Sequence, residues 1–366
     1  MSLGSSRWPP AGVSPDRLIR PELLELSGYH VADATGLIKL DAMENPHPLP
    51  GALREELGRI AAAATMNRYP DPQAQALKTA LMGAFDVPQR EMLLLGNGSD
   101  ELIQILAMSV ARPGATVLAP EPSFSMYRLI ARWCGLRYVS VPLRADFSLD
   151  TAAFIAAIER ERPALTFLAY PNNPTGNLFG VEAIEAILAA APGLVVIDEA
   201  YHAYAQTSWL DRVPSEPGLV VLRTLSKLGL AGLRIGVLIA QAQWVAEFDK
   251  LRLPYNLNVL SQLIATRLLG ESALFAAQIQ SILDERTRLA SALGTLRGVH
   301  VYPSQANFLL FRVAHAERIF DGLRARRVLI RMLAGSHPLL ADCLRVTVGT
   351  PDENDMFLNA MQDLLK

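Results

Sequence analysis

The sequence predicts an α/β fold, with a mostly parallel sheet in a large domain and a smaller α+β domain after it. Between residues 92 and 227, short apolar runs that end in turn residues alternate with segments of helical periodicity. After residue 260 this alternation stops, and a long helical stretch leads into a few strand-like runs. The length of 366 residues also exceeds the usual size of a single domain.

Each apolar run is typical of a strand that is buried on both faces of a sheet. The runs are MLLLGNG (92–98), ATVLAPEP (115–122), ALTFLAYPNNP (164–174), LVVIDEAY (194–201) and LVVLRTLSK (219–227). Three segments between them, 100–111, 125–134 and 180–191, carry apolar residues at helical spacing. Strands that alternate with helices predict a parallel sheet covered by helices.

The C-terminal part predicts a different arrangement. A helical stretch (272–297) precedes ANFLLFRV (306–313), AERIFDGLRARRVLIRML (316–333), CLRVTVG (343–349) and a terminal helix. Before residue 40, prolines and glycines indicate an arm rather than a packed element. We therefore expect an N-terminal arm (1–50) that joins the small domain, a large domain (51–261) and a small C-terminal domain (262–366).

The composition argues against several classes of partner. The formal net charge is −2 and no run of five like charges occurs, so the chain has no evident surface for a nucleic-acid backbone. Cys134 and Cys343 are the only cysteines and lie far apart, which argues against a disulfide framework or a zinc site. No signal peptide or membrane-spanning stretch is evident. We expect a cytoplasmic protein with no metal, membrane or nucleic-acid partner.

Polar motifs follow four of the predicted strands. They are GNGSDE (96–101), PNNPTG (171–176), DEAY (198–201) and RTLSK (223–227). Because ligands of open parallel sheets bind at the carboxyl ends of the strands, these motifs predict one binding site that is assembled from distant segments.

The GNGSDE motif is typical of a turn that begins a helix. Gly96 and Gly98 allow a tight turn, and Ser99 and Asp100 can cap the helix and leave backbone N–H groups for a phosphate. A plain helix cap has the same pattern. Glu101 stands where a dinucleotide fingerprint has its third glycine, so a small phosphate ester is the better fit.

Two carboxylates and a lysine end the next two predicted strands. Asp198 needs a compensating partner at such a position, for example the protonated nitrogen of a heteroaromatic cofactor, and Tyr201 could donate to a ring oxygen. Glu199 is expected to cap or pair at the surface. Lys227 stands beside a Ser/Thr pair and near Arg234, where partial burial would favour the neutral amine that attacks carbonyls. Lys227 is therefore predicted to form a Schiff base.

These motifs resemble those of the fold type I pyridoxal-phosphate aminotransferases, and within them the histidinol-phosphate aminotransferases. The resemblance rests on YPNNPTG, DEAY and RTLSKLGLAGLRIG, and on GNGSDE, LDAMENP (40–46), NRYPDPQAQALKTAL (67–81), LPYNLNVLSQ (253–262), SQANFLLF (304–311) and LRVTVGT (344–350). It runs from about residue 20 to the C-terminus. Met43 departs from it, because the family usually has asparagine there.

The resemblance implies a role for each matching residue. Lys227 matches the Schiff-base lysine, which also transfers protons, Asp198 the partner of the pyridine nitrogen, and Asn173 and Tyr201 the groups at the phenolic oxygen of pyridoxal 5′-phosphate. Tyr127 matches the aromatic residue that stacks on the ring. The phosphate-binding segments correspond to Gly98, Ser99, Asp100, Thr224, Ser226 and Arg234. Tyr69 resembles a tyrosine that reaches the phosphate in the neighbouring subunit, which implies a homodimer.

The resemblance also implies the reaction, an amino transfer from L-histidinol phosphate to 2-oxoglutarate that gives imidazole-acetol phosphate and L-glutamate. Arg331 and Arg345 are the candidates for the anionic end of the substrates, and Tyr29 is a further candidate. A threonine-phosphate decarboxylase or an aromatic-amino-acid aminotransferase could carry nearly the same motifs. Two further alternatives come from other classes of protein. A transcriptional regulator with an aminotransferase-like domain would need a fused DNA-binding domain, and a nicotinamide-dependent dehydrogenase would need the dinucleotide-binding fingerprint that the GNGSDE motif lacks.

Overall fold

The computed structural model describes residues 13–26, 28 and 31–366. These residues belong to two compact units that divide between Asp33 and Ala34. The first unit contains the short helices α1 (Pro15–Leu18) and α2 (Pro21–Leu24), each of which begins with a proline. Proline suits the first helical turn because its missing N–H has no partner within a helix there. All elements named below belong to the second unit.

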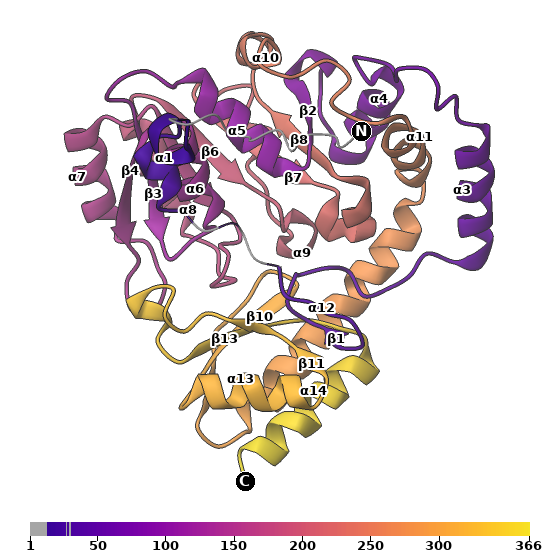
Figure 1. The fold of residues 1–366 in the computed structure, drawn as a ribbon, viewed down its shortest axis with the longest axis vertical. Coiled ribbons are helices and arrows are strands. Elements are labelled where there is room, and N and C mark those ends of the chain that lie inside the picture. The colour runs from indigo at the N-terminus through magenta and orange to yellow at the C-terminus, as the bar shows by residue number, and fades with distance from the viewer. Residues whose placement is uncertain (1–12, 27, 29–30) are drawn as a thin grey trace, which may run out of the picture. The chain divides into compact units, whose positions relative to one another are not determined.

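The second unit is built on a large sheet, whose strands run from purple at β2 to pink at β8, and a small sheet in gold (Figure 1). The large sheet consists of β2 (Leu93–Asn97), β3 (Thr116–Glu121), β4 (Arg137–Pro142), β5 (Leu165–Ala169), β6 (Leu194–Asp198), β7 (Leu219–Thr224) and β8 (Ile235–Ile239). Its strand order is β2-β8-β7-β6-β5-β3-β4. The strands from β7 to β4 run parallel, so the predicted fold class is confirmed.

All five predicted strands are present, and β4 and β8 are additional to them. β8 lies antiparallel to both β7 and β2. Its direction follows from its connection, because only the short turns η3 (Ser226–Leu230) and η4 (Ala231–Leu233) separate it from β7. A parallel pairing would need a much longer crossover.

Helices cover both faces of the large sheet. One face packs on α5 (Ser99–Ser109), α6 (Met126–Trp133) and α10 (Ala242–Asp249). The other face packs on α4 (Gln75–Phe85), α7 (Thr151–Glu161), α8 (Val181–Ala190) and α11 (Val259–Leu268). Neighbouring residues of one strand, such as Leu94 and Leu95, belong to the two different clusters, as the alternation of side chains in a strand requires. The apolar runs are therefore buried on both sides.

The small sheet is antiparallel, with the order β12-β13-β10-β9. Its strands are β9 (Val299–Val301), β10 (Phe308–Val313), β12 (Arg331–Met332) and β13 (Cys343–Thr347). A separate parallel pair joins β1 (Ile38–Lys39) to β11 (Val328–Leu329). The remaining helices and turns are α3 (Gly51–Ala63), α9 (His202–Ala205), α12 (Ser272–Gly294), α13 (Ala316–Ala325), α14 (Pro351–Leu364), η1 (Arg90–Met92), η2 (Leu210–Arg212) and η5 (Pro338–Leu340). Both sheets lie in the same compact unit, and the domain boundaries at residues 50 and 261 stay predictions.

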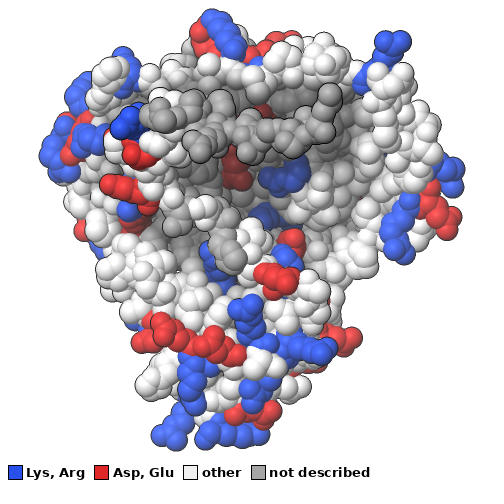
Figure 2. Space-filling model, in the orientation of Figure 1, with Lys and Arg blue, Asp and Glu red and all other residues white. Residues whose placement is uncertain are grey.

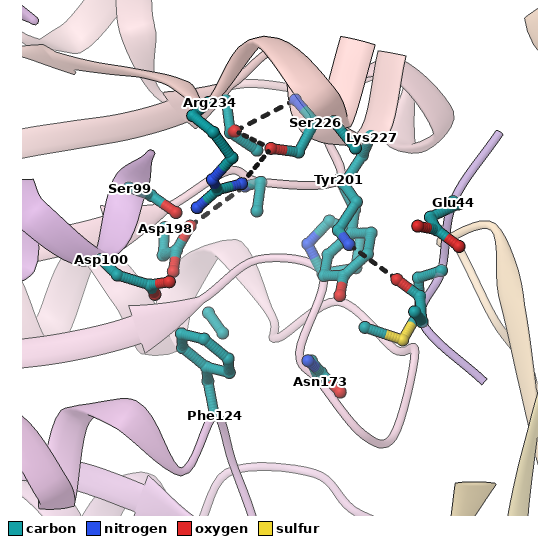
Figure 3. Close-up of a pocket in the computed structure, with 17 residues that line it drawn as sticks. Glu44, Ser99, Asp100, Phe124, Asn173, Asp198, Tyr201, Ser226, Lys227 and Arg234 are labelled. Atoms are coloured by element: carbon teal, nitrogen blue, oxygen red, sulfur yellow. Dashed lines mark hydrogen bonds between the residues drawn. The ribbon is translucent and has the colours of Figure 1, made fainter. Parts of the chain in front are cut away.

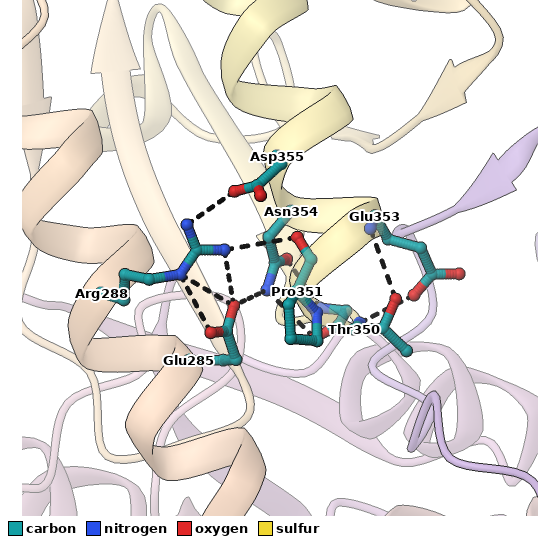
Figure 4. A network of polar contacts seen from close by, with 8 residues as sticks. Glu285, Arg288, Thr350, Pro351, Glu353, Asn354 and Asp355 are labelled. Carbon is teal, nitrogen blue, oxygen red and sulfur yellow. Dashed lines mark hydrogen bonds and ion pairs between the residues drawn. The ribbon is translucent and has the colours of Figure 1, made fainter.

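A polar network joins α12 to α14 and fixes the turn after β13 (Figure 4). Glu285 accepts hydrogen bonds from Arg288 and from Nδ2 of Asn354, the latter at 2.8 Å. The fully buried Asn354 also bonds both backbone groups of Gly349, its Oδ1 accepting from the N–H at 2.9 Å and its Nδ2 donating to the carbonyl at 3.0 Å. Thr350 caps α14. These contacts hold the end of the strand that carries Arg345.

Among the described residues, no single helix is both long and apolar enough to cross a membrane, although the bent pair α11 and α12 would pass by length and composition. The face in Figure 2 carries basic and acidic side chains close to one another rather than separated into regions of one sign.

Candidate active site

A pocket of about 270 Å³ lies at the carboxyl ends of the strands of the large sheet. Its lining includes nine residues that the sequence predicts for the site, and Figure 3 shows most of these side chains pointing toward a common space. They are Ser99, Asp100, Asn173, Asp198, Tyr201, Thr224, Ser226, Lys227 and Arg234. The fold thus brings together side chains that are up to 135 residues apart in the sequence, from Ser99 to Arg234.

One end of the pocket is a cradle for an anion. Ser99 is the first residue of α5, so its backbone N–H and those that follow are free of helical partners. Across from it, Thr224 Oγ1 lies 2.9 Å from Ser226 Oγ, and Arg234 Nη1 donates to Ser226 Oγ at 3.5 Å. Hydroxyl groups, a guanidinium and a helix N-terminus together are suited to a phosphate.

Gly98 makes this cradle possible. Its φ is +83°, and a Cβ at this position would lie 2.4 Å from Nη2 of Arg234. A side chain would therefore displace the guanidinium as well as strain the backbone. The predicted reason for glycine here was the tight turn, and the close approach of Arg234 adds a second one.

Lys227 lies in the π-helical turn η3, directly after β7. π-helical turns are rare and occur frequently at functional sites. Lys227 Nζ donates a hydrogen bond to the carbonyl of Ala42 at 2.9 Å. Burial lowers the pKa of Lys227 to about 8, and the nearby guanidinium of Arg345 acts in the same direction. The amine is thus much closer to its neutral form at physiological pH than a solvated lysine.

Asp198 ends β6 and is buried. Burial raises its pKa to about 6, while the hydroxyl of Tyr127 and the backbone N–H of Ala200 donate to the carboxylate and oppose that shift. A buried carboxylate with only neutral donors is well suited to a cationic ring nitrogen.

The structure corrects two expectations near Asp198. Tyr127 does not line the pocket, because its ring is stacked on Phe167 at 4.6 Å between centroids and its hydroxyl donates to Asp198 at 2.7 Å. The aromatic residue that lines the pocket is Phe124, which precedes α6. Glu199 is not at the surface either, since it is fully buried in an ion pair with Arg223 at 3.0 Å.

Tyr201, Asn173 and Arg345 form the other side of the site. Tyr201 packs edge-on against Phe308, with 5.2 Å between ring centroids, and burial raises the pKa of its hydroxyl. Arg345 donates to Oδ1 of Asn173 at 2.5 Å and to the carbonyl of Asp41 at 2.9 Å. Arg345 is therefore held in place, although it does not itself belong to the pocket lining.

Two other predicted residues, Arg331 and Tyr69, lie outside the pocket lining. Arg331 pairs directly with Arg345 across β12 and β13, so both side chains are on the same face of the small sheet. Tyr69 is 79% exposed and its ring is stacked on that of Tyr255 at 4.4 Å. Tyr29 lies outside the described residues.

Sequence analysis assigned no site role to the segment from Ala42 to Glu44, whose three residues all line the pocket. The LDAMENP motif (40–46), with its departure at Met43, was the signal that pointed there. No sequence pattern shows which backbone carbonyl accepts a hydrogen bond from a lysine. The hydrogen bond from Lys227 to the carbonyl of Ala42 could therefore be found only in the structure.

The site fits pyridoxal phosphate. The cradle offers donors for the phosphate, Asp198 can face the ring nitrogen, Phe124 can contact the ring, and the amine of Lys227 shares the same pocket. Among the residues that the structure describes, no group of histidine, cysteine and carboxylate side chains could hold a metal ion.

Comparisons with known proteins agree with this geometry. Residues 35–361 match the family described as aminotransferase class I and II. The chain is 51% identical over 349 residues to histidinol-phosphate aminotransferase 1 of Ralstonia nicotianae, covering 94% of this chain and 93% of that one. It is 52% identical over 350 residues to histidinol-phosphate aminotransferase 2 of Burkholderia pseudomallei, covering 95% and 98%. The crystal structure of the Sinorhizobium meliloti histidinol-phosphate aminotransferase in complex with pyridoxal-5′-phosphate is similar, with 26% identity, a TM-score of 0.85 and coverage of 94% and 96%.

Proposed function

This chain belongs to the class I and II aminotransferase family, and we propose that it transfers the amino group of L-histidinol phosphate to 2-oxoglutarate. The products are imidazole-acetol phosphate and L-glutamate, and the reaction belongs to histidine biosynthesis. One observation carries the proposal. Relatives named histidinol-phosphate aminotransferase share about half of their residues with this chain over more than nine tenths of both lengths. The decarboxylase and the aromatic aminotransferase are not favoured by these relatives.

Pyridoxal 5′-phosphate is the cofactor, and when bound it supplies an electron sink for the charge left by the departing α-proton. Ser99 and Asp100 would contribute backbone N–H groups to its phosphate, and Gly98 leaves the space in which Arg234 approaches it. The side chains that complete the phosphate site are Thr224, Ser226 and Arg234. These groups fix the position of the cofactor before any chemistry takes place.

Asp198 would keep a proton on the ring nitrogen by offering it a buried carboxylate. Tyr201 and Asn173 lie on the other side of the site, where the Tyr201 hydroxyl and Nδ2 of Asn173 would bind the phenolic oxygen of the ring. Asn173 accepts from Arg345 with its Oδ1, so its Nδ2 is the atom that donates. Nζ of Lys227 accepts the proton from the substrate α-carbon and returns it later. Its lowered pKa keeps part of the amine neutral for this purpose.

Arg345 binds the carboxylate of glutamate, and Arg331 contributes to the phosphate of histidinol phosphate. The two residues form a direct cross-strand pair, so their side chains lie on the same face of the small sheet. A dianionic phosphate gains more from two cations than a single carboxylate does.

We also place the enzyme in the cytoplasm as a homodimer in which Tyr69 reaches the phosphate site of the partner subunit. Large apolar side chains are exposed in the segments 66–72 and 252–263. These two segments contact each other, because the rings of Tyr69 and Tyr255 are stacked and Arg252 donates a hydrogen bond to the carbonyl of Pro72. Those side chains are Met66, Tyr69, Leu253, Tyr255 and Leu263. A surface of this kind is typical of a protein interface.

The function is tested with purified enzyme, histidinol phosphate and 2-oxoglutarate, with product analysis by mass spectrometry. We expect glutamate and imidazole-acetol phosphate, and no carbon dioxide from threonine phosphate. The Lys227→Ala variant should retain the phosphate cradle but lose nearly all turnover, on the order of 10³-fold or more. Release of carbon dioxide from threonine phosphate at a rate above amino transfer would instead identify a decarboxylase. Sedimentation of wild type and Tyr69→Ala at equal concentration tests the dimer.

A further inference from the structure

The segment from Asp41 to Glu44 lies along the pocket and has no role in the function described so far. Ala42, Met43 and Glu44 all line the pocket, and this segment begins three residues after the end of β1. Met43 and Phe124 are the two large side chains of that lining that carry no hydroxyl, amide or charged group. Since Phe124 is the candidate for the cofactor ring, Met43 is the apolar group that remains for a substrate.

The backbone of this segment is held at three successive carbonyl groups. Arg345 Nη2 donates to Asp41 O at 2.9 Å, Lys227 Nζ to Ala42 O at 2.9 Å, and Asn307 Nδ2 to Met43 O at 3.0 Å. The N–H of Met43 donates to Oγ1 of Thr347 at 3.0 Å. Both backbone groups of Met43 are thus bonded to the small sheet region, which leaves its side chain little choice of direction.

Met43 adopts an uncommon backbone conformation for its residue type. Its φ is +52°, in the left-handed region that glycine and asparagine occupy more readily. Such conformations persist only where the surroundings hold them, and they are enriched at functional sites. Here the conformation is held by the bonds to Thr347 and Asn307.

Glu44 adds a carboxylate beside Met43 (Figure 3). Nζ of Lys39 forms ion pairs with this carboxylate and with Asp41, the latter at 3.3 Å. The ion pair with Lys39 restricts the rotation of Glu44, while the side chain still lines the pocket. The other carboxylates of the lining lie elsewhere: Asp198 serves the ring nitrogen, and Asp100 interacts with Arg234.

We propose that Met43 and Glu44 together recognise the ring of the amino donor. The thioether of Met43 contacts the face of the ring, and the carboxylate of Glu44 accepts a hydrogen bond from a ring N–H. An imidazole offers both features, whereas glutamate, the other amino donor of the same site, offers neither. The proposal rests on the proposed function for the identity of the ring, and it makes the pair a specificity determinant that acts on only one of the two half-reactions.

The test measures kcat/KM of each half-reaction separately, from the absorbance of the bound cofactor after mixing holoenzyme with one amino donor. Met43→Gly removes the side chain and relieves the left-handed conformation at the same time. We expect kcat/KM for histidinol phosphate to fall about tenfold, while the value for glutamate changes less than twofold. Met43→Leu keeps an apolar side chain, so its kcat/KM for histidinol phosphate should lie within about threefold of the wild-type value.

A matched control is His315→Gly. His315 has a similar left-handed φ of +58° but is exposed at the start of α13, outside the pocket lining. It should leave both half-reactions unchanged. Met43→Ala provides a second deletion should the glycine variant fold poorly, and an unaltered cofactor spectrum verifies that each variant retains the site.

Glu44→Gln separates the polar part of the proposal from the apolar part. This variant should lower kcat/KM for histidinol phosphate and for L-histidine about five- to tenfold. The kcat/KM for L-phenylalanine, whose ring has no N–H, should not change. Equal losses for ring-bearing donors and glutamate in the Met43 variants would overturn the proposal and leave the proposed function intact. If the wild type rejects histidinol phosphate but accepts histidine or phenylalanine, the proposed function fails and the same variants test the ring contact on those donors. A wild type that accepts no ring-bearing donor overturns both.

Discussion

Tyr127 donates its hydroxyl hydrogen to Oδ2 of Asp198 at 2.7 Å, inside the core between α6 and the large sheet. Because burial alone raises the pKa of Asp198, this hydrogen bond is one of the two interactions that favour its carboxylate form. The tyrosine thus acts on the cofactor through Asp198 rather than by stacking on the ring.

Tyr127→Phe should raise the pKa of Asp198 above its value of about 6. The carboxylate would then be protonated at higher pH, and turnover at pH 6 to 7 should fall about tenfold, with a smaller loss at pH 8.5. A pH–rate profile of kcat measures the shift. Tyr138→Phe removes the hydroxyl of a half-buried tyrosine that does not bond Asp198, and serves as the control. Parallel profiles for wild type and Tyr127→Phe would show that the hydrogen bond has no electrostatic role.

Asp198→Asn should still bind the cofactor, because the phosphate cradle is untouched. Proton abstraction should slow by a factor on the order of 10² or more, since the ring nitrogen loses its anionic partner. Single-turnover absorbance with an α-deuterated amino donor reports the proton-transfer step directly. An unchanged rate of deprotonation would exclude the role assigned to Asp198.

The reaction of Lys227 with added cofactor should depend on pH in a defined way. A pKa of about 8 in place of 10.5 makes about 10% of the amine neutral at pH 7, against roughly 0.03% for a solvated lysine. The rate at which apoenzyme takes up pyridoxal phosphate should therefore level off above pH 8, whereas the rate for a simple alkylamine should keep rising toward pH 10. Arg345→Gln removes a charge that lowers this pKa, so its midpoint should move to higher pH. A wild-type rate that keeps rising to pH 10 would contradict the buried amine.

The two arginines of the small sheet should differ in substrate preference. Arg331→Ala should lower kcat/KM for histidinol phosphate more than kcat/KM for glutamate, because a dianion loses more from a missing cation. The loss for histidinol phosphate should correspond to about 2 to 4 kcal/mol of transition-state binding. Arg345→Ala should instead cause its largest loss of kcat/KM with glutamate and 2-oxoglutarate. The readout is kcat/KM for each half-reaction in both variants. Equal losses for the two donors in Arg331→Ala would mean that other residues hold the phosphate.

Asn354→Ala should destabilise the fold without touching the pocket. Asn354 is fully buried and bonds Glu285 and both backbone groups of Gly349, which would be left without these partners. We expect a loss of about 2 to 4 kcal/mol in the free energy of unfolding, measured by thermal or denaturant unfolding of the holoenzyme. Gln280→Ala, which removes an exposed hydrogen bond to Asp284, is the control and should have little effect. Unaltered stability in Asn354→Ala would show that water replaces the network.

Most of the site could be predicted because its polar residues follow apolar strands. Asp198 and Thr224 are strand-end residues, and their strands pair in parallel, so their side chains must meet at one edge of the sheet. The sequence assigned the stacking role to Tyr127 alone, and the structure instead has Phe124, which precedes α6, in the pocket lining. Tyr127 is stacked on Phe167 of β5, a contact between distant segments that the sequence pattern does not show.

The sequence by itself determined the strands β2, β3, β5, β6 and β7, their burial on both faces, and the identity of the residues at their ends, because these follow from local periodicity and turn chemistry. Only the tertiary structure decided that β8 turns back between β2 and β7, that Glu199 is buried against Arg223, and that the carbonyls of Asp41 to Met43 accept bonds from Arg345, Lys227 and Asn307. These features join residues that are far apart in the chain. Their energies depend on distance, burial and backbone direction, and none of these quantities is encoded in the pattern of any single segment.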